Sequence, residues 1–273
     1  MKKYKIGEFS KKVGVTQEFL KHYQNNGILI PNEITEAKYR YYDQRNASTV
    51  LEIIKDKNYG FSVKEIERVF RHSSTDQVLT LMEPKIDQMK RQLIFMQGVI
   101  AEYEKLKTFC EETRKDQWFV KATDAFYFLP HVDVRGFVED PFIYEILPAW
   151  IQHMPIVKSC QCCPADQPED YVWGLSVPQQ AADQIQLPVN SSVQLCPRRQ
   201  FFEYHSIFAL GKSKENPLQK ALAQMRLLGL KPVDSIYRNI LMYTEYQSDG
   251  TVEHSILYIP FTQESFIPNP DRD

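Results

Sequence analysis

The feature that most constrains this chain is a regular apolar stripe in its middle. Apolar residues recur at spacings that alternate between three and four, at Leu79, Met82, Ile86, Met89, Leu93, Met96, Ile100 and Tyr103. This spacing predicts one long helix with an apolar seam, and charged residues fill the intervening positions. We expect a coiled-coil dimerisation helix over residues 75–116, in which these eight side chains face a second copy. The alternative is a stripe that packs on the chain's own C-terminal half.

One residue of this stretch complicates the predicted helix. Pro84 lies early in the apolar run, and a proline inside a helix removes one backbone hydrogen bond. It therefore either kinks the helix or marks its true first turn. We expect the coil to fade near 109–114, leaving Lys115-Asp116 as the joint to the next domain.

Charge is unevenly distributed along the 273 residues. Residues 1–75 carry 14 Lys and Arg against 9 Asp and Glu, whereas residues 117–273 carry 12 against 18. A basic front favours a polyanionic partner, because phosphate neutralisation dominates affinity for nucleic acid. The acidic, aromatic-rich rear is better suited to a small molecule. Without an apolar run of membrane-spanning length or a signal-peptide core, we expect a cytoplasmic protein with reduced cysteines.

The first 74 residues have the pattern of a helix-turn-helix domain. Ile6, Phe9 and Val13 lie on one face of a short helix, which Gly14-Val15 interrupts. Thr16 can then cap a second helix, to about Asn25, that buries Phe19, Leu20 and Tyr23. Two short helices around a glycine turn form the unit that places its second helix in the major groove of DNA.

A basic hairpin and two further helices follow. The apolar, extended stretch 28–31 leads into a polar turn over 32–37, and the segment Lys38–Asp43 brings cations and phenols that can contact phosphates. Asp43 should cap a helix reaching about Tyr59. Its expected buried residues are Val50, Leu51, Ile53 and Ile54. Ser62 with Glu65 predicts a capping box for a shorter helix with the apolar face Ile66, Val69 and Phe70.

Six short motifs together resemble the DNA-binding domain of the MerR family of transcription regulators. They are Tyr4-Lys5-Ile6-Gly7-Glu8-Phe9, Gly14-Val15-Thr16, Leu20-Lys21-His22-Tyr23, Gly27-Ile28-Leu29, Tyr39-Arg40-Tyr41-Tyr42-Asp43 and Gly60-Phe61-Ser62-Val63-Lys64-Glu65-Ile66. The family commonly has arginines in the recognition helix where this chain has Glu18 and Lys21, so we expect a different operator. The resemblance implies a homodimer paired through antiparallel helices.

The resemblance also implies how such a dimer acts. It would bind an inverted-repeat promoter and distort it, so that RNA polymerase can use promoter elements that are otherwise too far apart. The expected DNA contacts are Tyr4, Thr16, Gln17, Lys21, His22, Tyr23, Lys38, Tyr39, Arg40 and Tyr42.

The C-terminal half, residues 117–273, alternates strand-like and helical runs. Extended runs are expected at 118–129, 171–177 and 200–210, with helices at 143–153 and from Asn216 to Leu228. Two more strands, 236–246 and 251–261, flank an Asp-Gly turn. A repeated strand–helix–strand–strand unit predicts an α+β domain, an antiparallel sheet with helices.

This half is similar to the gyrase-inhibitor-like effector domain that is often fused to such regulators, including multidrug-sensing members. The similarity rests on Gly229-Leu230-Lys231-Pro232, Ser235-Ile236-Tyr237 and Leu257-Tyr258-Ile259-Pro260-Phe261. It implies a cleft that binds amphipathic, often cationic compounds between aromatic walls and a buried acid. The family often has glutamate where this chain has Ile256, which puts the counter-charge for a cation in doubt.

We expect ligand contacts from aromatic residues and from three glutamates that lie in strand-like settings. These candidates are Trp118, Tyr127, Trp150, Trp173, Phe202, Glu203, Tyr204, Tyr237, Glu245, Glu253 and Tyr258. A glutamate on a strand can equally well face solvent. A buried acid beside aromatic rings would have a raised pKa and would pair with an incoming cation.

The cysteines support a competing hypothesis. Cys160, Cys162 and Cys163 fall within four residues of a predicted loop, and thiolates are the ligands that soft metals prefer. Metal-sensing relatives usually carry their cysteines near the dimerisation helix, where this chain has only Cys110. The main hypothesis is therefore a ligand-responsive regulator with no catalytic residues, no bound metal and no cofactor. A metal or thiol sensor, or an effector domain with small-molecule hydrolase activity, remains the alternative.

Overall fold

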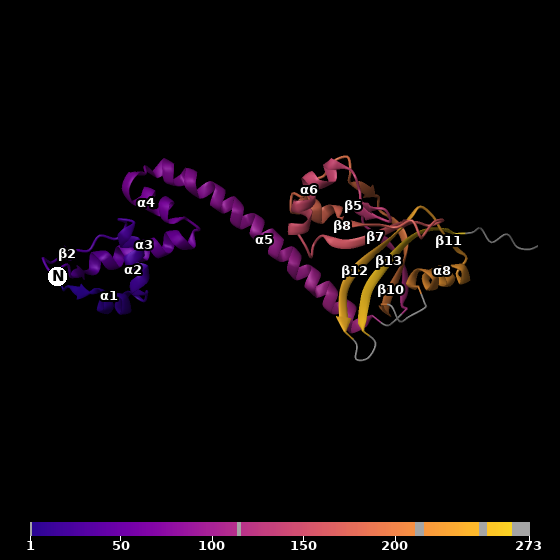
Figure 1. Ribbon diagram of the computed structural model, residues 1–273, viewed down its shortest axis with the longest axis horizontal. Coiled ribbons are helices and arrows are strands. Elements are labelled where there is room, and N and C mark those ends of the chain that lie inside the picture. The colour runs from indigo at the N-terminus through magenta and orange to yellow at the C-terminus, as the bar shows by residue number, and fades with distance from the viewer. Residues whose placement is uncertain (1, 114–115, 211–215, 246–249, 264–273) are drawn as a thin grey trace, which may run out of the picture. The chain divides into compact units, whose positions relative to one another are not determined.

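The computed structural model describes residues 2–113, 116–210, 216–245 and 250–263 (Figure 1). The chain divides into two compact units, Met1–Gln92 (unit 1) and Leu93–Asp273 (unit 2). Within the described residues, none of the helices combines the length and apolarity needed to cross a membrane.

Unit 1 begins with two short helices, α1 (Ile6–Val13) and α2 (Gln17–Asn25), as the spacing predicts. Gly14 ends α1 in the left-handed conformation at φ 73°, and the Thr16 side chain accepts a hydrogen bond from the backbone N–H of Phe19 at 3.1 Å. A small antiparallel sheet has the strand order β1-β3-β2. Its members are β1 (Tyr4–Lys5), β2 (Glu33–Ile34) and β3 (Arg40–Tyr42).

The helices α3 (Gln44–Asn58) and α4 (Val63–His72) complete the core of unit 1. Each begins with a capping box, formed by Asp43 with Asn46 and by Ser62 with Glu65. The core contains Phe9, Leu20, Tyr23, Ile28, Leu29, Tyr42, Val50, Ile53, Phe61 and Ile66. Two expected core positions are wrong: Leu51 and Phe70 are exposed, because α3 and α4 turn these positions away from the packed face. The stretch 28–31 is apolar but forms no strand.

Helix α5 (Thr75–Glu112) spans 38 residues and continues from unit 1 into unit 2. Pro84 lies inside it, so this proline does not mark the first turn. Of the eight expected seam residues, Met82 is partly buried against the unit 1 core. The other seven are exposed in the single chain, at Leu79, Ile86, Met89, Leu93, Met96, Ile100 and Tyr103.

Unit 2 is built around an antiparallel sheet of ten strands, in the α+β class expected from the sequence. The main path runs β4-β10-β13-β12-β7-β8-β5-β6, while β9 pairs with β5 and β11 with β13. Its strands are β4 (Trp118–Thr123), β5 (Phe126–Asp133), β6 (Gly136–Phe137), β7 (Lys158–Pro164), β8 (Val172–Pro178), β9 (Gln194–Cys196), β10 (Arg199–Ala209), β11 (Leu230–Pro232), β12 (Ser235–Glu245) and β13 (Thr251–Gln263).

Two copies of one strand–helix–strand–strand unit make up most of this sheet. The first contains β5, α6 (Pro141–Gln152), β7 and β8; the second contains β10, α8 (Pro217–Leu227), β12 and β13. They meet where β7 pairs with β12 in the middle of the sheet, from Ser235 opposite Pro164 to Asn239 opposite Cys160. The short helix α7 (Gln179–Gln184) follows the first copy. The cysteine-rich stretch, expected as a loop, is strand β7, because it pairs on both sides.

Each copy packs its helix on its own core. Trp150 of α6 is fully buried with Leu129, Val157 and Leu175, and Phe95 of α5 packs against this cluster. Met225 and Ala221 of α8 pack against β10 and β13 side chains. The hairpin formed by β12 and β13 pairs Glu245 with Thr251. The connecting residues 246–249 of the expected Asp-Gly turn lie outside the described residues.

Candidate nucleic-acid interface and ligand cavity

Helix α2 presents a polar face to solvent because its apolar residues are used in the core. Leu20 and Tyr23 are buried, whereas Gln17, Lys21 and His22 are exposed. Thr16, which caps the helix, is exposed as well. The hydroxyl of Thr16 accepts the capping hydrogen bond, and the exposed surface of this helix carries amide, ammonium and imidazole groups together with the carboxylate of Glu18. These are groups that contact base edges and phosphates.

The hairpin between β2 and β3 adds positive charge to this unit. Lys38, Tyr39 and Arg40 are all exposed. Lys38 adopts a positive φ of 62°, and its N–H donates to the carbonyl of Thr35 at 2.8 Å. Nζ of Lys5 lies 5.5 Å from the Tyr39 ring. The turn therefore holds cationic and phenolic groups together at the surface.

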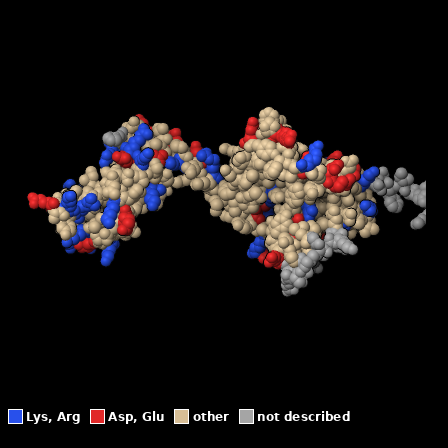
Figure 2. Space-filling view, in the orientation of Figure 1, with Lys and Arg blue, Asp and Glu red and all other residues tan. Residues whose placement is uncertain are grey.

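The half-buried Tyr4 lies among further lysines of the same unit. Nζ of Lys2 and Nζ of Lys12 lie 5.6 and 5.3 Å from its ring. Figure 2 shows that Lys and Arg side chains gather over unit 1 on the face in view. A patch of this composition can neutralise several phosphates at once.

Tyr23 and Tyr42, two expected DNA contacts, lie in the core of unit 1. Tyr42 stacks on Phe9 with ring centroids 4.9 Å apart and donates its hydroxyl hydrogen bond to Oε1 of Gln24 at 3.0 Å. Burial raises the pKa of both phenols. Buried side chains cannot contact DNA directly, so the surface of the candidate interface consists of the other eight expected residues.

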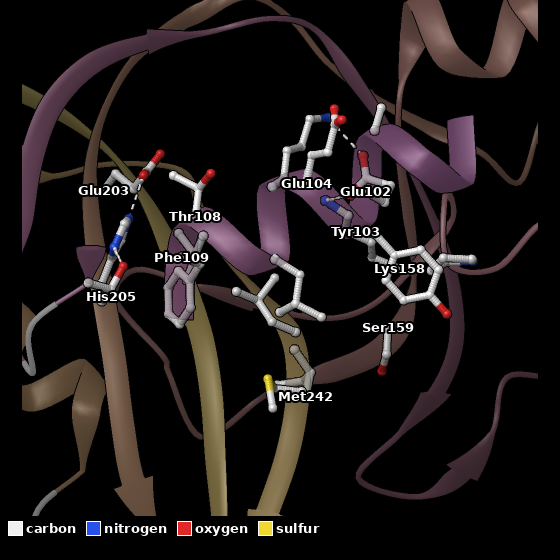
Figure 3. Close-up of a pocket in the computed structure, with 18 of the residues that line it drawn as sticks. Glu102, Tyr103, Glu104, Thr108, Phe109, Lys158, Ser159, Glu203, His205 and Met242 are labelled. Atoms are coloured by element: carbon white, nitrogen blue, oxygen red, sulfur yellow. Dashed lines mark hydrogen bonds and ion pairs between the residues drawn. The ribbon is translucent and has the colours of Figure 1, made fainter. Parts of the chain in front are cut away.

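Unit 2 contains a cavity of about 1050 Å³. The C-terminal part of α5 supplies one wall, and most of the rest comes from strands β4, β7, β10, β12 and β13 (Figure 3). Met154, Pro155 and Val157, between α6 and β7, also line it. Its apolar lining includes Leu106, Phe109, Phe119, Ile240 and Ile256. A volume of this size accommodates a drug-sized molecule.

A buried carboxylate with two partners lies at one side of the cavity. Glu203 of β10 is 3% exposed, and its Oε1 lies 2.8 Å from Nζ of Lys121 and 2.7 Å from Nε2 of His205. Nδ1 of His205 lies 3.0 Å from the hydroxyl of Thr113, directly after α5. Burial alone would raise the pKa of Glu203, but the hydrogen bonds from His205 and Lys121 hold it below its ordinary value. Glu203 is therefore ionised at neutral pH.

A second paired carboxylate lies on the opposite side of Figure 3. Glu102 of α5 lies 2.7 Å from Nζ of Lys158 on β7 and 2.8 Å from Nζ of Lys105. Burial would raise the pKa of Glu102, but the charge of Lys158 and hydrogen bonds from both lysines lower it. The ring of Phe109 lies beside that of His205 in this view, with the ring centroids 5.1 Å apart.

Of the expected ligand contacts, Glu203 and Tyr258 line this cavity. Burial raises the pKa of Tyr258. Tyr103, expected in the helix seam, lines the cavity too. Lys121, Lys158 and His205 were not expected from the sequence. The available signal was that Phe119 and Lys121, and likewise Glu203 and His205, are two positions apart on a strand and so face the same side of the sheet.

The other expected ligand contacts lie elsewhere in unit 2. Trp150, Phe202 and Tyr204 are buried in the helix-covered cores, and Trp118 stacks on Phe202 at 5.5 Å. The hydroxyl of Tyr127 accepts from Gln179 at 3.1 Å, Trp173 is half-buried on β8, and Glu245 is exposed. Glu253 is buried and pairs with Arg238. Tyr237 is buried among cysteines and phenylalanines.

The cysteine cluster has the character of core rather than of a metal site. Cys160, Cys162, Cys163 and Cys196 are all buried. Burial raises the pKa of all four thiols, to about 11 for Cys163 and Cys196. Among the residues that the structure describes, no group of three or more His, Cys, Asp or Glu side chains could hold a metal ion. Thiols that resist ionisation are poor metal ligands.

An exposed second helix after a glycine turn, with a basic hairpin beside it, defines unit 1 as a helix-turn-helix domain. Residues 4–73 match the model of the MerR HTH family regulatory proteins. The N-terminal part of this chain is therefore similar to the helix-turn-helix domain of MerR-family regulators, and α5 joins it to a sheet-rich domain with a cavity.

Several known proteins are similar to this front segment. The nodulation protein NolA of Bradyrhizobium sp. (strain NC92) is 36% identical over 77 residues, 28% of this chain and 32% of that protein. The activator mta of Bacillus subtilis is 30% identical over 89 residues (33% and 35%). The multidrug-efflux transporter 2 regulator of the same organism is 32% identical over 104 residues (37% and 38%). The chain thus spans well under half the length of these relatives.

Among solved structures, a cryo-EM structure of an EcmrR–DNA complex is 16% identical and covers 96% of this chain and 100% of that chain, with a TM-score of 0.36. The N-terminus of the Bacillus subtilis multidrug transporter activator is 24% identical and covers 37% of this chain and 95% of that one, with a TM-score of 0.32.

Proposed function

We propose that this protein is a ligand-responsive transcription regulator. A homodimer binds promoter DNA through unit 1 and distorts it for RNA polymerase, and a small amphipathic or aromatic compound binds in the cavity of unit 2. The MerR-family match of residues 4–73 supports the first half of this proposal. The similar B. subtilis activator and efflux-transporter regulator support the second by analogy.

The observation that carries the proposal is that one helix, α5, contributes residues both to unit 1 and to the cavity of unit 2. Residues of α5 up to Gln92 belong to unit 1, where Leu81 and Met82 pack on the core. Its last turns line the cavity of unit 2. A ligand in that cavity therefore contacts the same continuous helix that packs on the DNA-binding unit. A binding event can bias a distant site only through an element that both sites share or influence.

DNA contact is assigned to the surface of α2 and the basic hairpin. The residues are Tyr4, Thr16, Gln17, Lys21, His22, Lys38, Tyr39 and Arg40. Lys38 and Arg40 would contact phosphates, while Gln17, Lys21 and His22 would face the major groove. Because phosphate contacts dominate affinity, binding should weaken steeply as the salt concentration rises.

Dimerisation is assigned to the exposed seam of α5. A stripe of seven large exposed apolar side chains on one helix is costly in water. Antiparallel pairing of α5 with that of a second chain would cover it. Such a two-fold dimer reads an inverted repeat, so the operator should contain two related half-sites.

Footprinting of the DNA upstream of this protein's own gene tests the proposal. The panel contains neutral amphiphiles, aromatic cations, Zn²⁺ and Cu⁺. We expect protection of an inverted repeat that a small organic compound alters and that the metals leave unchanged. Absence of any protected region at low salt would refute DNA-binding regulation, and a response to metal alone would favour the thiol-sensing alternative.

A further inference from the structure

The two buried carboxylates that face the cavity already have their counter-charges. Glu203 is held by Lys121 and His205, and Glu102 by Lys158 and Lys105. The side chains of Glu203 and Glu102 are 3% and 11% exposed, whereas those of Lys121 and Lys158 are 53% and 22% exposed, so it is the carboxylates that are removed from water. Neither carboxylate is therefore available as an uncompensated anion inside the cavity.

Two further acidic residues line the cavity, Glu104 and Glu112, and both lie on α5. Unlike Glu203 and Glu102, they are exposed. Water screens their charge, so they contribute little to binding a buried cation. The apolar part of the lining includes Phe109, Ile240 and Ile256.

From this arrangement we propose that the cavity selects a net-neutral amphipathic molecule over a lipophilic cation of the same shape. The inference rests on the proposed ligand-responsive function and specifies the chemical class of its ligand. Hydrogen-bonding groups of the ligand would lie near Glu203 and His205 or near Glu102 and Lys158. Its apolar body would lie against Phe109 and its neighbours.

The physical reason is the cost of burying charge. A cation that enters this cavity loses its hydration and meets two carboxylates whose charge is already neutralised. To use Glu203 or Glu102 as its counter-charge it must displace Lys121 or Lys158, which breaks an existing ion pair. Contact with the faces of Phe109 and Tyr258 offsets only part of this cost. A neutral molecule of equal shape avoids it.

Isosteric probes separate charge from shape. We would titrate the full-length protein calorimetrically with a tert-butyl biphenyl alcohol and with its trimethylammonium isostere, which differs by one positive charge. Wild-type protein should bind the neutral probe about tenfold more tightly or better. Ser159→Trp, which fills the cavity from β7, should abolish binding of the neutral probe and so locate it.

Removing one counter-charge should reverse the preference. Lys121→Met removes the ammonium partner of Glu203, so affinity for the cation should rise about tenfold. Lys121→Arg keeps the charge and should behave as wild type. The double variant Lys121→Met/Glu203→Gln has no net charge at this position and should lose the gain, which excludes an effect of side-chain shape.

The outcomes distinguish this inference from the function on which it rests. Preference of the wild type for the neutral probe, reversed in Lys121→Met, supports it. Equal or tighter binding of the cation by wild type overturns the inference while leaving ligand sensing intact. Binding of neither probe, or binding that Ser159→Trp leaves unchanged, contradicts both a ligand site in this cavity and its preference for neutral molecules.

Discussion

The hydroxyl of Thr113 lies 3.0 Å from Nδ1 of His205. Thr113 directly follows the last residue of α5, and His205 lies in the middle of β10. Because a carboxylate only accepts hydrogen bonds, Nε2 of His205 must donate to Glu203, and in the neutral imidazole Nδ1 then accepts from Thr113. This bond joins the end of the long helix to the carboxylate at the cavity.

Thr113→Val should weaken the link between the cavity and α5. The substitution keeps the shape of the side chain and removes the hydroxyl, with a loss of about 1 kcal/mol in the free energy of unfolding. We expect ligand affinity to change little and the ligand-induced change in the DNA footprint to shrink. Thr108→Val, at a cavity-lining threonine within α5, is the matched control. Equal footprint responses in wild type and Thr113→Val would argue against this link.

Leu93→Asp should convert the protein into a monomer. Leu93 is an expected seam residue and is 60% exposed in the single chain. A charge in the buried seam of a coiled coil is strongly unfavourable. Light scattering should give the mass of two chains for wild type and one chain for the variant. Gln92→Asp, at the adjacent position outside the seam, should remain dimeric; a dimeric Leu93→Asp would place the interface elsewhere.

Arg40→Ala should weaken DNA binding on every sequence to a similar extent. Arg40 is exposed at the start of β3, where a guanidinium can contact a phosphate. Fluorescence anisotropy at several salt concentrations gives the slope of the logarithm of the association constant against the logarithm of the salt concentration. For Arg40→Ala the magnitude of this slope should be smaller than for wild type by about one. Arg198→Ala, an exposed arginine of unit 2, serves as the control. Unchanged affinity of Arg40→Ala would remove the hairpin from the interface.

The contribution of Glu203 to stability should disappear in acid. Its pKa in the folded protein lies below the ordinary 4.5, since the hydrogen bonds from His205 and Lys121 outweigh burial. The contribution is thus complete above pH 4.5 and is lost as the pH falls through the folded-state pKa. Wild type and Glu203→Gln should differ by about 1–2 kcal/mol in urea unfolding at neutral pH. The difference should vanish in acid; a constant difference would contradict this ionisation.

Local signals made unit 1 largely predictable from the sequence. The caps at Thr16, Asp43 and Ser62 depend on residues three positions away, and the structure contains all three. The exposure of Leu51 was not predictable, because it depends on which face of α3 meets the other helices. The repeated unit of the sheet was also visible as a pattern of alternating strands and helices.

The cavity was much less accessible to sequence reasoning. Its walls come from α5 and from β4, β7, β10, β12 and β13, and apart from the β12–β13 hairpin the pairing of these strands is non-local. Aromatic residues such as Trp150 and Phe202 were candidates for its walls, yet they fill cores beneath α6 and α8. Which face of a strand a residue occupies depends on register, so the grouping of Lys121 with Glu203 emerged only from the fold.

Hydrogen–deuterium exchange of the full-length protein tests the account most directly, with promoter DNA and a cavity ligand added separately. The account predicts that DNA slows exchange in α2 and in the hairpin around Arg40. The ligand should slow exchange over 101–113 and around His205 on β10, and should also change exchange in α5 before Gln92. Protection of the sheet domain by DNA, or a ligand effect that leaves α5 unchanged, would contradict it.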